Sequence, residues 1–129
     1  MKSSTEHDEQ VALFQWARLN ESKYPQLKWM FAIPNGGKRH IGTAVKLKRE
    51  GVKAGVPDIF LPYSMNHSCG IYHGLFIELK RLKPRGKTTP EQIEWIDALH
   101  KEHYAVHVCW GWESARDVIV DYLRRAWDE

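Results

Sequence analysis

The chain has 129 residues, of which 43% are hydrophobic and 27% are charged, as is typical of a single globular domain. The net charge of +3 and the pI near 8.9 are compatible with a nucleic-acid partner but do not require one. No apolar run is long enough to span a bilayer, and the polar start MKSSTEHDEQ lacks the apolar stretch of a signal peptide. We therefore expect one cytoplasmic domain over residues 1–129, with no membrane partner.

Hydrophobic periodicity and turn residues predict the order helix, strand, helix, strand, strand, helix, strand, helix. The expected ranges are, in that order, 9–19, 29–33, 41–50, 59–61, 75–79, 90–103, 104–110 and 113–127. The run WMFAI at 29–33 is stopped by Pro34 and is typical of a buried strand. Gly51 is suited to ending the helix before it, and TPEQ at residues 89–92 is typical of a capped helix start.

This order predicts an α/β fold with a mixed central sheet flanked by helices. The strands at 59–61 and 75–79 are joined by a polar connection at residues 63–72, which is short enough for an antiparallel pair. The strand at 104–110 follows a helix, as a crossover connection requires.

Two of the expected strands carry acidic groups at positions that can bring them together. Asp58 stands at the start of one strand, and Glu78 and Lys80 lie near the end of the other. Residues i and i+2 of a strand point to the same face, so Glu78 and Lys80 project together. If the two strands pair, Asp58 can meet them across the ladder.

A carboxylate within such apolar strands is costly unless it is paired or bound to a cation. A divalent cation removes the repulsion between two close carboxylates, and Mg²⁺ prefers oxygen ligands while keeping several waters. Such a cation lowers the pKa of its bound water and polarises phosphoryl oxygens. Lys80 could then hold the attacking water or stabilise negative charge in the transition state. The alternative is that Glu78 and Lys80 form an ordinary exposed ion pair.

The segments GVPD at 55–58 and FIELK at 76–80 resemble the PD-(D/E)xK nuclease signature. Nearly the whole chain resembles the VRR-NUC domains, of the stand-alone type found in phages and bacteria. The resemblance includes the NGG loop at 35–37, Gln92 after the motif, and the order of the elements. It implies a restriction-endonuclease-like αβββαβ core, with one extra helix after the first strand.

By this resemblance, Asp58 and Glu78 are metal-binding acids, Lys80 is the catalytic lysine, and the backbone carbonyl of Leu79 is a further metal ligand. The implied cofactor is Mg²⁺ or Mn²⁺, and no organic small-molecule cofactor is expected.

Two further site residues follow from the resemblance, and each leaves an alternative open. Glu9 matches the acidic residue of the first helix that reaches the metal in some members, although Glu6 and Asp8 lie close by. Gln92 matches a glutamine that supports the site, and the alternative is a plain capping residue.

Basic residues are concentrated in the middle of the chain, as phosphate contacts require. Glycines can also bring backbone N–H groups close to a phosphate, although an exposed turn is the commoner meaning of Gly-Gly. The residues that we expect to contact nucleic acid are Asn35, Gly36, Gly37, Lys38, Arg39, Lys53, Arg81 and Lys83.

Three functions compete at this point. The first is a metal-dependent endonuclease; the resemblance implies branched DNA, such as four-way junctions or flaps, and a homodimer would place two sites on two symmetric strands. The second is a catalytically inactive DNA-binding module with a nuclease-like fold, against which the intact Asp58, Glu78 and Lys80 argue. The third is a metal-dependent enzyme acting on a smaller phosphate ester, whereas the broad basic distribution favours a polymer.

Overall fold

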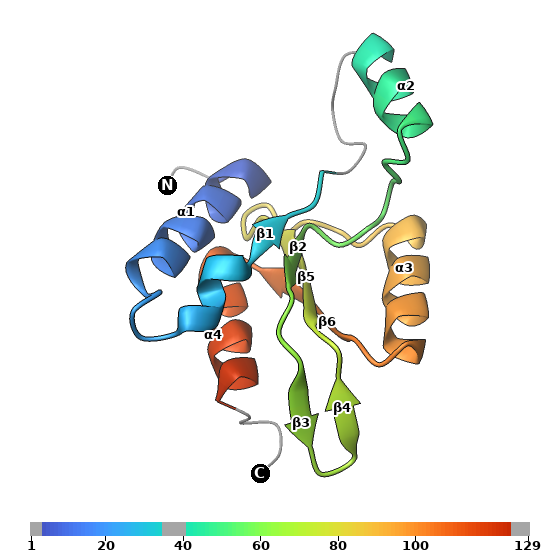
Figure 1. Cartoon of the computed structure of the whole chain (residues 1–129). Helices are drawn as coiled ribbons and strands as arrows, with labels where there is room; N and C mark the ends of the chain where they lie inside the picture. Colours follow the sequence, from blue (N-terminus) through green and yellow to red (C-terminus); the bar gives the residue numbers. More distant parts are fainter. Residues whose placement is uncertain (1–3, 35–40, 125–129) are drawn as a thin grey trace.

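The computed structural model describes residues 4–34 and 41–124 (Figure 1). In chain order its elements are α1 (Glu6–Leu19), the 3₁₀ helix η1 (Pro25–Trp29), β1 (Phe31–Ala32), α2 (Ile41–Arg49), β2 (Ile59–Leu61), β3 (Met65–His67), β4 (Gly70–Tyr72), β5 (Leu75–Lys80), α3 (Pro90–Lys101), β6 (Ala105–Trp110) and α4 (Trp112–Leu123). The predicted α/β fold with a mixed sheet flanked by helices is confirmed, and η1, β3 and β4 are additional to the predicted elements. In these described ranges, no helix is long and apolar enough to cross a membrane.

Four strands form a mixed sheet in the order β1-β2-β5-β6. Strands β1, β2 and β5 pair in antiparallel fashion, and β6 runs parallel to β5. The antiparallel pairing of β2 with β5 and the crossover through α3 to β6 were predicted, and both are confirmed. In the β2–β5 register, Ile59 lies opposite Ile77 and Leu61 lies opposite Leu75.

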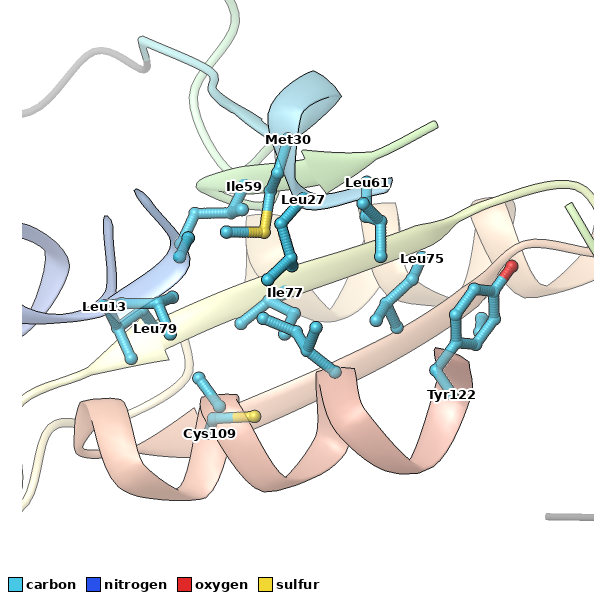
Figure 2. Packing of buried hydrophobic residues seen from close by; sticks show 14 of the residues in the cluster. Leu13, Leu27, Met30, Ile59, Leu61, Leu75, Ile77, Leu79, Cys109 and Tyr122 are labelled. Carbon is cyan, nitrogen blue, oxygen red and sulfur yellow. The ribbon is translucent and has the colours of Figure 1, made fainter. Parts of the chain in front are cut away.

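Helices α1 and α4 cover one face of the sheet, and the hydrophobic core lies between the helices and that face (Figures 1 and 2). Alternate residues of β2 and β5 point into this layer and are nearly inaccessible to solvent. The labelled side chains in Figure 2 are Leu13, Leu27, Met30, Ile59, Leu61, Leu75, Ile77, Leu79, Cys109 and Tyr122. Because side chains alternate along a strand, Asp58, Phe60, Phe76, Glu78 and Lys80 belong to the opposite face.

Helix α3 covers only part of that second face. It packs against β6, and none of its residues is buried. Ile93 is half exposed, while Ile96 and Leu99 are partly buried, so its expected apolar side is only loosely covered. Over residues 4–34 and 41–124, no helix packs extensively on the β1–β2 half of this face.

Helix α2 stands away from the sheet (Figure 1). It ends as expected at Gly51, which has a φ of 98°. The Gly51 N–H donates to the carbonyl of Lys48, and the Val52 N–H donates to that of Leu47, at 3.1 and 2.9 Å. This is the Schellman pattern, which satisfies the last carbonyls of a helix.

Helix α1 begins three residues earlier than expected. Thr5 caps it by accepting a hydrogen bond from the Asp8 N–H, and the Asp8 side chain accepts one from the Thr5 N–H. This reciprocal capping box places Glu6 and Glu9 together in the first turn of the helix.

The connection at residues 63–72 contains the β3–β4 hairpin, which the sequence analysis did not predict. The His67 and Tyr72 rings stack across it, with centroids 4.5 Å apart, and Met65 is buried in the core. Strands of three residues are too short to produce a clear alternating pattern, which is why the hairpin was not predicted. Side-chain pairs across the two strands compensate for their weak local strand preference.

The prediction of a buried strand at residues 29–33 was wrong. Trp29 ends the 3₁₀ helix with 65% of its surface exposed, and Phe31 on the edge strand β1 is 48% exposed. Only Met30 of this run joins the core. The 3₁₀ helix runs from Pro25 to Trp29, so it takes up the first residue of the predicted strand.

Candidate active site

Asp58 and Glu78 meet on the face of the sheet opposite the core. Asp58 directly precedes β2, and Glu78 lies within β5. The Asp58 Oδ2 atom accepts a hydrogen bond of 2.8 Å from the Leu79 backbone N–H, and the Asp58 carboxyl also hydrogen-bonds the Glu78 carboxyl. The β2–β5 pairing thus brings the two acids together, with the Leu79 backbone beside them and the Leu79 side chain in the core.

Glu78 is almost fully buried, with 2% of its surface exposed. Its Oε1 atom has no hydrogen-bond partner among the described residues. Burial, followed by the hydrogen bond to Asp58 and the charge of Asp58, raises the pKa of Glu78 to about 10, although Lys80 opposes this shift. The Glu78–Lys80 pair is therefore a buried group, and the alternative of an ordinary exposed ion pair does not describe it.

Lys80 is held from two sides. Its Nζ lies 4.0 Å from the Glu78 Oε2 and donates a 2.7 Å hydrogen bond to the Gln92 Oε1. The same Gln92 oxygen accepts a hydrogen bond from the Thr89 N–H, and the Gln92 N–H donates to the Thr89 hydroxyl. Gln92 therefore both caps α3 and fixes the lysine, so the two interpretations of this residue are compatible.

The basic loop at residues 81–87 packs directly against Lys80. A Cβ at Gly86 would lie 3.3 Å from the Lys80 Cβ, so the loop backbone touches the lysine stem. The Trp110 Nε1–H donates to the Gly86 carbonyl at 2.7 Å, and the Arg85 guanidinium lies 3.9 Å from the Trp110 ring centroid. The exposed cations of this loop are Arg81, Lys83, Arg85 and Lys87.

Glu9 and Glu6 have different surroundings. The buried Glu9 carboxylate accepts hydrogen bonds from the Trp112 backbone N–H, at 2.8 Å, and from the Ser4 hydroxyl. The α4 N-cap, Gly111, provides no side-chain cap, so Glu9 supplies a negative charge to the N-terminus of α4 from the neighbouring helix α1. The charge of Glu6, by contrast, acts on Glu78 and contributes to its raised pKa.

The remaining expected contact residues are distributed around this centre. Lys53 is exposed in the loop that leads to Asp58. The expected phosphate-binding loop, with Asn35, Gly36, Gly37, Lys38 and Arg39, lies outside the described residues.

A contact not anticipated from the sequence joins the two sides of the site. Gly55, in the loop before Asp58, has a φ of 91°, and a Cβ there would lie 2.7 Å from the Glu91 backbone carbon. Glu91 directly precedes Gln92, so the loop that positions Asp58 rests on the helix turn that positions Lys80. A glycine with positive φ could have been suspected from the sequence, but its contact could not.

We predict that Gly55→Ala destabilises the protein by about 3 kcal/mol or more, because it combines an unfavourable φ with a backbone clash. Gly51→Ala is the matched control: its φ is 98°, but no atom lies within 4 Å of the added Cβ. It should cost only about 1 kcal/mol. Urea unfolding measures both, and equal losses would mean that the Gly55–Glu91 contact contributes nothing.

We also predict that Glu78→Gln stabilises the protein increasingly as pH rises from about 5 to 9 in EDTA. The folded state holds the Glu78 proton up to a pKa of about 10, whereas the unfolded state releases it near 4.5. Stability from this group is thus complete below pH 4.5 and is lost as pH rises toward 10. The difference in unfolding free energy between variant and wild type should grow by up to about 1.4 kcal/mol per pH unit. Denaturant titrations at several pH values measure it, and a pH-independent difference would contradict the prediction.

Comparison with known protein families matches residues 4–112 to the VRR-NUC domain. Among solved structures, a VRR_NUC domain protein is 32% identical, with a TM-score of 0.76 over 95% of this chain and 91% of its own. No match was found among curated proteins. The matched range spans most of the chain, and Asp58, Glu78, Lys80 and Gln92 lie within it. The chain therefore belongs to the VRR-NUC family and has the PD-(D/E)xK nuclease fold of that family.

Proposed function

We propose that the chain is a divalent-metal-dependent endonuclease that hydrolyses phosphodiester bonds in DNA. The observation that carries this proposal is the buried Glu78 carboxyl. This group lies beside Asp58, and its Oε1 has no hydrogen-bond partner in the described part of the chain. An arrangement this unfavourable in the free protein is typical of a site that stores strain for a ligand. Membership of the VRR-NUC family supports a nuclease.

The donor atoms at this site suit Mg²⁺ or Mn²⁺. The Asp58 and Glu78 carboxylates, with the Leu79 carbonyl, are hard oxygen ligands, which these ions prefer over nitrogen or sulfur. Within residues 4–34 and 41–124, no group of three His, Cys, Asp or Glu side chains could hold a metal, so water and phosphate oxygens are needed to complete the coordination. A bound cation supplies Lewis-acid polarisation of the phosphate and a lowered pKa for its water.

The protein's own residues position and stabilise charge. Asp58 is oriented by the Leu79 N–H, which keeps its carboxylate directed toward Glu78. Lys80 places a buried positive charge beside the acids, where it can stabilise the negative charge that develops on the phosphate. The hydrogen bond from the Lys80 Nζ to Gln92 keeps the ammonium group in place. It uses one of the three Nζ–H donors and leaves the others for the substrate.

We propose Glu6, rather than Glu9, as the acid of the first helix that assists the metal. Both oxygens of Glu9 are occupied by the Trp112 N–H and the Ser4 hydroxyl. Glu6 is exposed, and its charge acts on Glu78. Because Glu6 does not form a three-residue ligand group with the acid pair, it would act through an intervening water.

The proposed substrate is branched DNA, such as a four-way junction or flap. The loop at 81–87 leaves β5 directly after Lys80, so its cations can contact phosphates next to the cleaved bond. Lys53 offers a second contact on the loop before Asp58. A homodimer of this single domain would present two centres to two symmetric strands.

We expect Asp58→Ala and Lys80→Ala each to reduce cleavage by about 10²–10³-fold, as loss of a charged transition-state contact does elsewhere. Labelled four-way junction, flap, single-stranded and linear duplex DNA would be incubated with Mg²⁺, Mn²⁺ or EDTA. Lys101→Ala, which alters an exposed lysine of α3, is the matched control and should cleave like wild type.

Metal-dependent cutting of DNA by the wild type, lost in both variants, would support the nuclease. Binding without cutting in any metal would instead favour the inactive DNA-binding module. Hydrolysis of nucleotides without DNA cleavage would favour the smaller phosphate ester. Light scattering of the protein during chromatography would test the homodimer independently.

Paired variants distinguish the two acids of α1. We expect Glu6→Gln to lower metal-dependent cleavage by about 10–100-fold with little effect on stability. Glu9→Gln should lower the unfolding free energy by about 1–2 kcal/mol, since it removes a charge from the α4 N-terminus, and should retain cleavage. Thermal melts and cleavage rates at a temperature where both variants are folded decide this, and the reverse pattern would restore Glu9 as the metal-assisting acid.

A further inference from the structure

A row of phenylalanine rings lies on the same sheet face as the acid pair. Phe60 follows Asp58 by two residues on β2, and Phe76 precedes Glu78 by two residues on β5. Because β2 and β5 are antiparallel, both rings lie on the same side of the acids. Their centroids are 4.3 Å apart with an interplanar angle of 30°, so the rings stack. Phe31 extends the row onto β1, opposite Phe60, where the two rings meet edge-on with centroids 5.8 Å apart and an interplanar angle of 79°.

The inner part of this row is held firmly in place. A Cβ at Gly74 would lie 2.7 Å from the Phe60 ring, so the absence of a side chain there makes room for the ring. The Tyr104 ring meets Phe76 and Phe60 edge-on, at 5.3 and 6.0 Å between centroids. Phe60 and Phe76 are therefore fixed in position, and Phe31 rests against a rigid neighbour.

The outer end of the row is open to solvent. Phe31 is 48% exposed, it lies on the edge strand, and it is not among the residues of the core or those packed against it. Helix α3 covers the β6 side of this face and has no extensive contact with β1 or β2. Phe31 is not a single exposed residue, because it continues into the partly exposed Phe60 and Phe76, and a contiguous apolar surface of this kind suggests contact with a partner.

The surroundings indicate which partner fits. The chain between β1 and β2 carries α2, whose last turn has three exposed cations, Lys46, Lys48 and Arg49. On the far side of the acid pair stands the basic loop at 81–87. The Phe60 and Phe76 rings are each two residues from the acids, and two residues of a strand span about 7 Å. Two base steps of a DNA strand span about the same length, so the row begins within a few nucleotides of a phosphate bound at the acids. A polyanion that also offers flat apolar faces matches both features.

We propose that Phe31, supported by Phe60 and Phe76, stacks on an unpaired nucleobase of the DNA strand whose phosphate lies at the acid pair. This inference rests on the proposed function and gives it a specificity. Bases in a continuous duplex are already stacked on their neighbours, whereas an unpaired base near a gap or branch is free to stack on an aromatic ring. DNA with unpaired nucleotides beside the cleaved phosphate should therefore bind more tightly than continuous duplex.

The test compares wild type with Phe31→Leu, which keeps apolar bulk against Phe60, and with Phe31→Trp, which keeps an aromatic ring. Ile71→Ala is the matched control, because Ile71 is 46% exposed on the distant β3–β4 hairpin (Figure 1). Binding is measured in Ca²⁺ with two DNAs of the same sequence, a continuous duplex and a gapped duplex with 2-aminopurine in the gap. Fluorescence of this base is quenched when it stacks.

We expect Phe31→Leu to weaken binding of gapped DNA by about tenfold and to abolish the quenching, while binding of continuous duplex changes less than about twofold. Phe31→Trp and Ile71→Ala should behave like wild type. Equal losses of binding on both DNAs, or no loss on either, would overturn the proposal that Phe31 stacks on an unpaired base.

Outcomes for this inference and for the nuclease are separate. If wild type cleaves DNA in Mg²⁺ but Phe31→Leu binds both DNAs normally, the nuclease proposal is supported and base stacking by Phe31 is rejected. If wild type binds gapped DNA more tightly and quenches its 2-aminopurine, both through Phe31, but cleaves nothing in Mg²⁺ or Mn²⁺, base stacking is supported and the nuclease proposal is rejected.

Discussion

The structure depends on the register between β2 and β5. Because Ile59 lies opposite Ile77 and Leu61 opposite Leu75, both strands direct their aliphatic side chains into the α1–α4 core. The same register directs Asp58 and Glu78 to the other face, one step beyond the first paired residues. A slip of one residue would move the aliphatic side chains of one strand to the opposite face and its charged side chains into the aliphatic core. Burial of the hydrophobic core therefore also enforces the proximity of the two carboxylates.

The two faces of the sheet have opposite effects on stability: the core face stabilises the domain, and the face that carries the acid pair destabilises it. The core face contains interlocked aliphatic groups, and its only buried charge near α4, Glu9 among the described residues, is satisfied by the Trp112 N–H. The opposite face contains Glu78, which burial and Asp58 keep protonated and which lacks a partner for Oε1 in the described chain. The core and the Gly55–Glu91 contact hold the two carboxyl groups side by side, and Glu78 must keep its proton for the pair to coexist there.

The parts that could be predicted from the sequence carry their own local signals. Asp58, Glu78 and Lys80 stand at fixed spacings on apolar strands, and Thr89 with Gln92 forms a capping box that needs no tertiary information. The roles of Glu6 and Glu9 could not be separated, because both lie in one turn of α1. Their separation depends on how α1 is rotated, which Leu13 fixes by entering the core. The basic loop was recognised by composition, but its attachment through Trp110 depends on a contact 24 residues away.

The segment at 29–33 shows a different kind of disagreement, and it is informative for function. Its apolar pattern is typical of a buried strand, yet Trp29 and Phe31 are exposed. Local preference and global fold usually agree in natural proteins, and the exceptions concentrate at functional sites. Phe31 lies on the face that carries the acid pair, where its ring meets Phe60 edge-on beside the stacked pair of Phe60 and Phe76. The exposure of Phe31 therefore agrees with its proposed role as a contact for an unpaired base of the DNA substrate.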